Sequence, residues 1–108
     1  MRPVLLLCLL VMAPRADASF IKKTSGSCGA GLIRTKVECE AAARALDVLH
    51  LLSDTSATTE SETGEPPGCY YWSGWDLEFN TNLASTHSCG SSRVCLCCST
   101  PGSCQDAP

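Results

Sequence analysis

Cysteine is the residue type in this chain that can do the most chemistry, and the number of cysteines indicates disulfide bonds. Nine cysteines occur in 108 residues. Cys8 lies in the apolar stretch at the N-terminus, and the other eight follow that stretch. An even number of cysteines in a short exported chain is typical of a disulfide framework. Eight cysteines allow on the order of a hundred pairings, and the sequence alone does not select one. The eight are Cys28, Cys39, Cys69, Cys89, Cys95, Cys97, Cys98 and Cys104.

The cysteines at the end of the chain restrict the pairing. In an extended strand Cys95 and Cys97 face one side and Cys98 faces the other. Adjacent cysteines rarely close on each other without strain, so Cys97 and Cys98 need different partners. We expect Cys98 to bridge to Cys104, which leaves the other six cysteines to pair within the core.

A thiolate metal site is the alternative use of the same residues. Cys95, Cys97, Cys98 and Cys104 could supply thiolates to zinc or copper. The chain lacks the two Cys-x-x-Cys pairs, or Cys with His, that zinc sites favour, and an oxidising secretory route converts thiols to disulfides. We therefore expect disulfides, with no metal and no cofactor.

Catalytic chemistry has little support in the sequence. A nucleophile needs a base, and after position 18 the only histidines are His50 and His87. His50 falls near the end of a predicted helix and His87 in a Ser/Thr-rich loop. Asp76 and Glu78 alternate along a predicted strand, an arrangement common on solvated strand faces. We expect no catalytic site and no enzyme activity.

Aromatic residues gather around a predicted hairpin and form the candidate binding face. If Trp75, Leu77 and Phe79 pack into the core, part of the set from 70 to 72 is left on the open face. Rings there could stack on a sugar or anchor a protein partner. In the alternative interpretation the rings only cover disulfides in a thin core, and the asparagines serve turn chemistry. The candidate binding residues are Tyr70, Tyr71, Trp72, Asn80 and Asn82.

The first 18 residues have the pattern of a secretory signal peptide. Arg2 is followed by an apolar run over 4–13 and then by Ala16-Asp17-Ala18. The run is about half of the ~20 residues that a membrane span needs. We expect a signal peptide over 1–18, a cysteine-rich module over 19–98 and a tail over 99–108. The protein would be secreted, extracellular or at the cell surface, with no stable membrane span after cleavage.

The net charge of the chain indicates which classes of binding partner to expect. From residue 19 onward the chain has six Lys/Arg and ten Asp/Glu, a net charge of −4. This balance argues against nucleic acid and against an anionic membrane. We expect an extracellular protein or a carbohydrate as partner.

The elements that must position these residues are a helix and a small sheet. Thr35 and Glu38 make a capping box, and apolar residues recur at helical spacing from there to Leu52. The segment 53–64 is rich in Ser, Thr and Glu and predicts a mobile surface loop, either plain or carrying O-linked sugar. Strands are predicted over 69–72, 75–79 and 93–98. The fold class is α+β: a small disulfide-rich domain with one helix packed on an antiparallel sheet of about three strands.

The order of several motifs resembles a six-cysteine extracellular module repeated in secreted and surface proteins of microalgae and other protists. The resemblance covers most of 28–97, and Cys98 and Cys104 lie outside it. More loosely, it is similar to apple-type modules, in which cysteines tie one helix to a small sheet. It implies compartment and framework but no assigned activity. The motifs are Cys28, Cys39-Glu40-Ala41-Ala42-Ala43, Pro66-Pro67-Gly68-Cys69-Tyr70-Tyr71, Phe79-Asn80-Thr81-Asn82, Cys89 and Cys95-Leu96-Cys97.

Taken together, the sequence predicts a secreted, non-enzymatic binding or structural module, with a carbohydrate or a protein as ligand at the aromatic hairpin. The alternative is a secreted inhibitor or effector that presents a loop to an enzyme or receptor.

Overall fold

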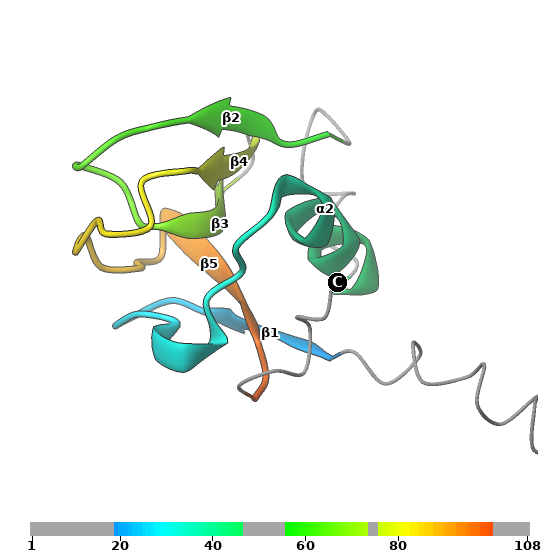
Figure 1. The fold of residues 1–108 in the computed structure, drawn as a ribbon. Coiled ribbons are helices and arrows are strands. Elements are labelled where there is room, and N and C mark those ends of the chain that lie inside the picture. The colour runs from blue at the N-terminus through cyan, green and yellow to red at the C-terminus, as the bar shows by residue number, and fades with distance from the viewer. Residues whose placement is uncertain (1–18, 47–55, 74–75, 101–108) are drawn as a thin grey trace, which may run out of the picture.

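The computed structural model describes residues 19–46, 56–73 and 76–100, which form one helix against a five-stranded mixed sheet (Figure 1). This is the small disulfide-rich α+β domain that the sequence predicts, with more strands than expected. The elements are β1 (Phe20–Lys23), the 3-10 turn η2 (Gly29–Gly31), α2 (Lys36–Ala45), β2 (Thr58–Glu60), β3 (Gly68–Trp72), β4 (Leu77–Asn80) and β5 (Arg93–Cys98).

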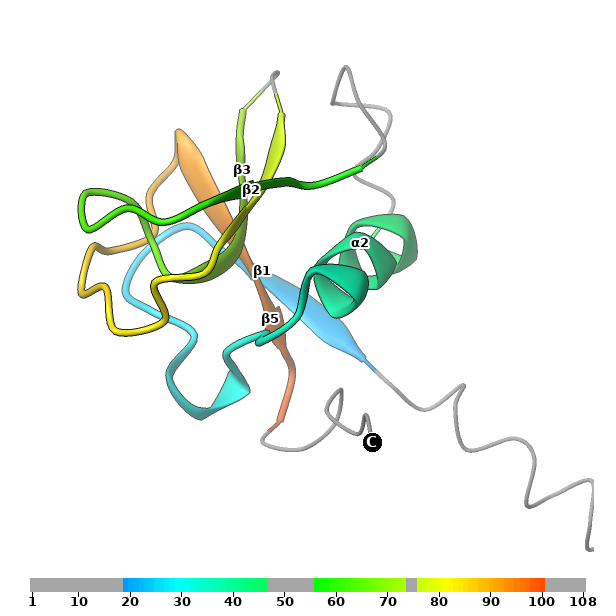
Figure 2. The same ribbon diagram turned by 45° about the horizontal axis from the view of Figure 1, so that its top comes forward.

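Helix α2 begins at the predicted cap. The backbone N–H of Glu38 donates to Thr35 Oγ1 at 3.2 Å, which satisfies one of the amides that a helix start leaves open. The helix buries Cys39, Ala42 and Ala43. Because alanine is small, the helix backbone can come close to the sheet, and Figures 1 and 2 both show it on one side of the strands. The predicted continuation over 47–52 lies outside the described residues.

The sheet has the strand order β1-β5-β3-β4-β2. The predicted hairpin is formed by β3 and β4, and β5 pairs antiparallel with β3, so the three predicted strands are confirmed as its centre. Neither of the two outer strands was predicted from the sequence. Strand β1 pairs antiparallel with β5, and β2 pairs parallel with β4.

The prediction that 53–64 is a mobile loop is wrong for its central part. Thr58–Glu60 forms β2, and Ala57 beside it is only 3% exposed. The N–H of Ala57 donates to the Glu40 carboxylate on α2 at 2.8 Å, and Glu60 O accepts from Thr81 N at 2.8 Å. Threonine fits an edge strand because its β-branched side chain favours extended backbone, whereas composition alone registers only its polarity. Residues 53–55 lie outside the described part.

Buried side chains form one cluster on each side of the sheet. The helix-side cluster is centred on Leu77, Phe79 and Leu96 and includes Cys39 and Ala42 of the helix. The disulfide-side cluster consists of Tyr70, Cys89, Cys95 and Cys97, with Cys28 and Trp72 packed against it. Alternation along β5 produces the division, since Val94, Leu96 and Cys98 face the helix while Cys95 and Cys97 face away.

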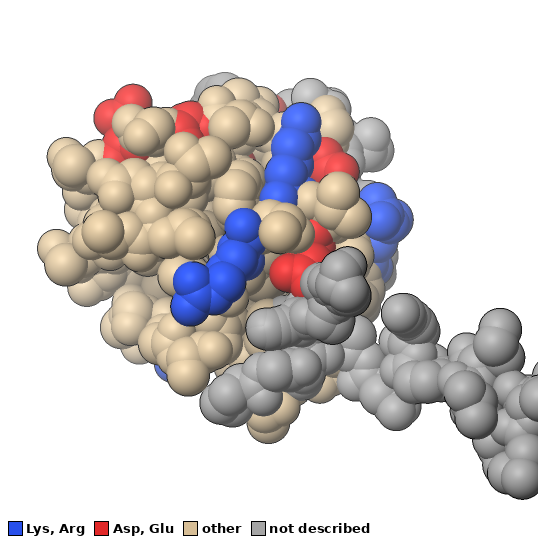
Figure 3. Space-filling model, viewed as in Figure 1, with Lys and Arg blue, Asp and Glu red and all other residues tan. Residues whose placement is uncertain are grey.

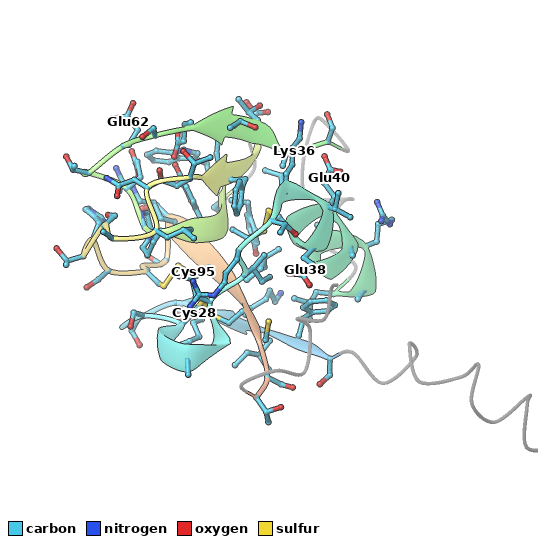
Figure 4. All side chains as sticks on the ribbon, viewed as in Figure 1. Cys28, Lys36, Glu38, Glu40, Glu62 and Cys95 are labelled. Carbon is cyan, nitrogen blue, oxygen red and sulfur yellow. A yellow bond between two sulfur atoms is a disulfide. The ribbon has the colours of Figure 1, made fainter. Side chains whose placement is uncertain are left out.

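Three disulfides join the described cysteines. Cys39–Cys69 ties the helix to β3 within the helix-side cluster, whereas Cys28–Cys97 and Cys89–Cys95 lie on the other side. In Figure 4, Cys28 and Cys95 lie close together beside η2. The six cysteines expected to pair within the core do so. Cys98 is disulfide-bonded as well, and its predicted partner Cys104 lies outside the described residues.

Two glycines let the segment before the helix approach the sheet. A Cβ on Gly31 would collide with the backbone carbonyl of Cys98 in β5. A Cβ on Gly68 would lie 2.8 Å from the Ile33 carbonyl oxygen, and Gly68 also has a φ of +76°, which favours glycine. The segment between η2 and α2 therefore lies against the ends of β5 and β3.

Candidate binding surface

Most of the predicted binding residues are buried. Tyr70 and Asn80 are 0% exposed and Tyr71 is 5% exposed. Tyr71 belongs to the helix-side cluster and Tyr70 to the disulfide-side cluster. Part of the set from 70 to 72 was expected on the open face, but Tyr70 and Tyr71 are not there, because both sides of the sheet are covered at β3. Trp72 and Asn82 are half-buried.

Asn80 fastens the backbone of the neighbouring loop. Its Nδ2 donates to the carbonyl oxygens of Glu62 at 2.9 Å and Pro66 at 3.0 Å, and its Oδ1 accepts from the N–H of Glu62 at 2.9 Å. Asn82 Oδ1 in turn accepts from Ala84 N at 3.2 Å, which is an Asx turn. The alternative interpretation, that these asparagines serve turn chemistry, is confirmed for the contacts they make.

Tyr70 is buried but keeps its hydroxyl satisfied. The phenol donates to Glu60 Oε2 at 2.6 Å, and the ring meets Trp72 edge-on with centroids 6.4 Å apart. Burial, together with the hydrogen bond to Glu60, raises the pKa of Tyr70 far above its ordinary value. Burial also raises the pKa of Glu60, although the hydrogen bond from Tyr70 opposes the shift. The phenol of Tyr70 therefore stays protonated and keeps donating at neutral pH.

Trp72 lies beside a charged pair that the sequence did not reveal. Arg93 is its cross-strand partner in the β3–β5 register, and the Arg93 guanidinium carbon lies 4.2 Å from the centroid of the indole. Such a position is a cation–π contact. Arg93 Nε also donates to Glu65 Oε1, and the two side chains are 29% and 19% exposed. One arginine thus bridges an aromatic ring and a carboxylate at the surface.

We call this region the Trp72 patch, and it comprises Trp72, Arg93, Glu65, Glu60 and Glu78. Glu78 is opposite Tyr70 in the β3–β4 register and faces away from the helix-side cluster, since Leu77 and Phe79 on either side belong to that cluster. Burial, with smaller contributions from Glu60, Asp76 and Glu65, raises the pKa of Glu78 to about 7. The patch has three carboxyl groups and one guanidinium, so its charge is negative.

The surface over helix α2 carries charges of both signs. Figure 3 shows basic and acidic side chains intermingled over the helix. Figure 4 places Lys36, Glu38 and Glu40 among them, along α2. This mixture is typical of a solvated helix face.

Sequence reasoning missed Arg93, Glu60 and Glu65 because their place depends on strand pairing. Arg93 begins the predicted strand at 93 and Trp72 ends the one at 72. An antiparallel register between these strands would have placed the two residues opposite each other, but nothing in the sequence specifies that register. Glu60 lies in the segment predicted to be a loop.

Metal chemistry has no visible site in the described ranges. No group of three or more His, Cys, Asp or Glu in 19–46, 56–73 and 76–100 is arranged to hold an ion. Cys95, Cys97 and Cys98 are all in disulfides and have no thiolate to offer. Within the same ranges, no helix combines the length and the apolar character needed to cross a membrane.

Comparisons with family models, curated proteins and solved structures find no match to this chain. The resemblance to a six-cysteine extracellular module therefore stays a prediction that rests on the motifs themselves.

Proposed function

We propose that this protein is an exported, non-enzymatic module that binds another extracellular protein through the Trp72 patch. The observation that carries the proposal is the arginine held between an indole ring and a carboxylate at the surface. Export is supported by the signal-like pattern over 1–18 and by a framework of disulfides, which persist in oxidising compartments.

Tryptophan and arginine are the residue types that most often dominate the binding energy of protein interfaces. Here both are half-buried, and each restrains the other by the cation–π contact. A side chain that is already ordered loses less conformational entropy when a partner binds. The patch is therefore organised before binding.

A protein partner suits the patch better than a carbohydrate. Tyr70 and Tyr71 are buried, and Arg93 covers the ring of Trp72, so these three rings leave no broad aromatic face for a sugar to stack on. The remaining groups are ionisable, and the carboxyl groups of Glu60, Glu65 and Glu78 outnumber the one arginine, although Glu78 is only about half ionised near pH 7. The complementary surface is basic, because charges of opposite sign steer association.

Photo-crosslinking tests the proposal even while the partner is unidentified. A photoreactive phenylalanine analogue at Ser73, which is exposed beside Trp72, should form a discrete adduct with an extracellular protein of the producing cells. The same analogue at Val37, 73% exposed on α2, is the matched control. Excess unlabelled wild-type protein should compete the adduct away, whereas folded Trp72→Ala protein should compete at least about tenfold less well.

The proposal fails if position 73 gives no adduct that wild-type protein competes. It also fails if Trp72→Ala competes as well as wild type, or if an equally specific adduct forms at position 37. Circular dichroism of each variant beforehand establishes that a lost adduct is not lost folding.

A further inference from the structure

A hollow whose lining shares no residue with the Trp72 patch lies where three loops meet. Its volume is about 310 Å³, and it is lined by the segment 27–29 with Leu32, by Pro67, and by Leu83 with the segment 85–87. This volume is at the small end of the range for ligand sites, roughly 300–1,000 Å³. The hollow therefore has room for one small group rather than for a long chain.

The lining combines hydroxyl groups with aliphatic surface, and His87 is its one ionisable side chain among the described residues. Ser27 and Thr86 bring hydroxyls, and Leu32, Pro67 and Leu83 bring apolar carbon. The hydroxyl of Ser85 also lines the hollow, but it donates to Glu65 O and accepts from His87 N. The described side chains that line it include no carboxylate, ammonium or guanidinium group. An anionic ligand would find no cation among them to replace its water, so the lining favours a neutral ligand.

His87 adds a hydrogen-bonding group at the edge of the hollow. Its Nδ1 lies 3.0 Å from the carbonyl oxygen of Ser88, which can only accept, so Nδ1 carries the proton in this contact. In the neutral imidazole Nε2 then has a lone pair and acts as an acceptor. A ligand hydroxyl could donate to this nitrogen.

Disulfides and hydrogen bonds hold the loops that form the walls of the hollow in place. Cys28, in one wall, is bridged to Cys97 of β5, and the Cys89–Cys95 bridge follows the other wall. The N–H of Cys89 donates to Gly26 O at 2.8 Å, which joins the two loops directly. Ser85 Oγ donates to Glu65 O at 2.6 Å. The loops of the site are thus ordered before a ligand binds, so binding costs little conformational entropy.

We propose that this hollow binds a single neutral, polyhydroxylated unit, namely one monosaccharide. A sugar presents hydroxyls on its rim and C–H groups on its faces, which matches a lining of hydroxyls, one imidazole and three aliphatic groups. This site is independent of the Trp72 patch. Its ligand could be a free sugar or the terminal unit of a glycan, because the hollow would contact the same atoms in both.

The test is an NMR titration of the oxidised protein with glucose, galactose, mannose and N-acetylglucosamine, and with glucuronate as the anionic comparison. At least one neutral sugar should give saturable amide shifts confined to 26–32, 65–68 and 83–89, with a Kd in the range of about 1–10 mM. Glucuronate should bind at least about tenfold more weakly. The Trp72→Ala variant should bind the sugar as wild type does, which separates this proposal from the preceding one.

Two variants assign the binding to the hollow. Thr86→Val removes one hydroxyl at nearly constant volume and should weaken binding about 2- to 10-fold, the loss expected for one hydrogen bond. Thr59→Val makes the same change on the exposed edge strand β2 and should leave the Kd unchanged. Leu83→Trp fills the hollow and should abolish the shifts.

The proposal is overturned if no neutral sugar gives a saturable shift up to ~50 mM. It is equally overturned if glucuronate binds as well as the neutral sugars, or if Thr86→Val and folded Leu83→Trp both bind like wild type. If binding is found, titration with the matching methyl glycoside and a disaccharide identifies the source. Equal Kd values indicate a free sugar, whereas tighter binding of the glycosides indicates a glycan terminus.

Discussion

The two sides of the central sheet are stabilised by different means. On the helix side, Leu77, Phe79 and Leu96 pack against alanines of α2, with the Cys39–Cys69 disulfide and the disulfide-bonded Cys98 among them. On the other side the buried cluster is Tyr70 with three cysteines, and two disulfides cross it. On that side, disulfide bonds stabilise the buried cluster, whereas beneath the helix aliphatic packing does so. That side can consequently carry charged side chains at its surface, and it holds the Trp72 patch.

The largest effect should come from removing a bridge on the disulfide side. Cys28–Cys97 spans 69 residues, so the paired Cys28→Ala/Cys97→Ala change should cost about 4 kcal/mol of unfolding free energy through the loosened unfolded chain. Cys89–Cys95 spans only 6 residues, and removing it should cost about 2 kcal/mol. Urea denaturation of both variants measures the two values. Equal losses would contradict the idea that this side depends on its long-range bridge.

A core truncation on the helix side should have the next largest effect. Leu77 is 0% exposed, so Leu77→Ala should cost about 3 kcal/mol from lost burial and the cavity left behind. Trp72→Ala removes a larger side chain on the opposite side but should cost less, about 1–2 kcal/mol, because this side chain is half-buried. Denaturation curves of the two variants, with all disulfides intact, decide the order. A greater loss for Trp72→Ala would mean that the disulfide side also depends on apolar packing.

The smallest effect should be a pH dependence confined to the disulfide side. The folded-state pKa of Glu78 is raised to about 7, while a glutamate in an unfolded chain titrates near 4.3. Between these values the folded state binds more protons, so stability falls as pH rises through this window and the ionised carboxylate is destabilising above it. Glu78→Gln should flatten this slope and add less than about 1 kcal/mol at pH above about 8, because solvent screens much of the interaction.

Unfolding midpoints at about pH 5 and about pH 8 measure the Glu78 contribution. Glu62→Gln removes a charge of the same sign from an exposed loop and should change the slope far less than Glu78→Gln does, because Glu62 makes only the smallest contribution to the raised pKa of Glu60. Some slope should remain in Glu78→Gln, since burial also raises the pKa of Glu60. If the two glutamine variants have the same slope, the local environment of Glu78 does not set the pH dependence.

Local signals predicted the centre of the fold well. The cap at Thr35, the hairpin of β3 and β4, and the opposite facing of Cys97 and Cys98 all follow from spacing along a few residues. The outer strands were missed because β1 and β2 bury little. Ile21 is 41% exposed, and Thr58 and Thr59 are exposed, so neither strand shows the alternation that marks a half-buried strand.

The candidate site was harder to predict than the fold because it depends on contacts between distant residues. An aromatic cluster indicated a binding face, yet Tyr70 and Tyr71 have become core on opposite sides of β3. A small domain has few large side chains with which to fill its interior, so its aromatic residues are drawn inward. Trp72 stays half-buried at the end of the strand, where Arg93 and Glu65 from two other segments join it. The spacing of these residues in the sequence does not predict that they come into contact.

The pairing of β1 with β5 joins the first described strand to the last. During synthesis β1 has no partner until β5 has been made, and Cys28 has no partner until Cys97 has been made. Contacts between segments so distant in the sequence form slowly. The order of the strands thus delays closure of the sheet until β5 has been synthesised, and a chain that stays open this long can pass through a channel that admits only unfolded polypeptide.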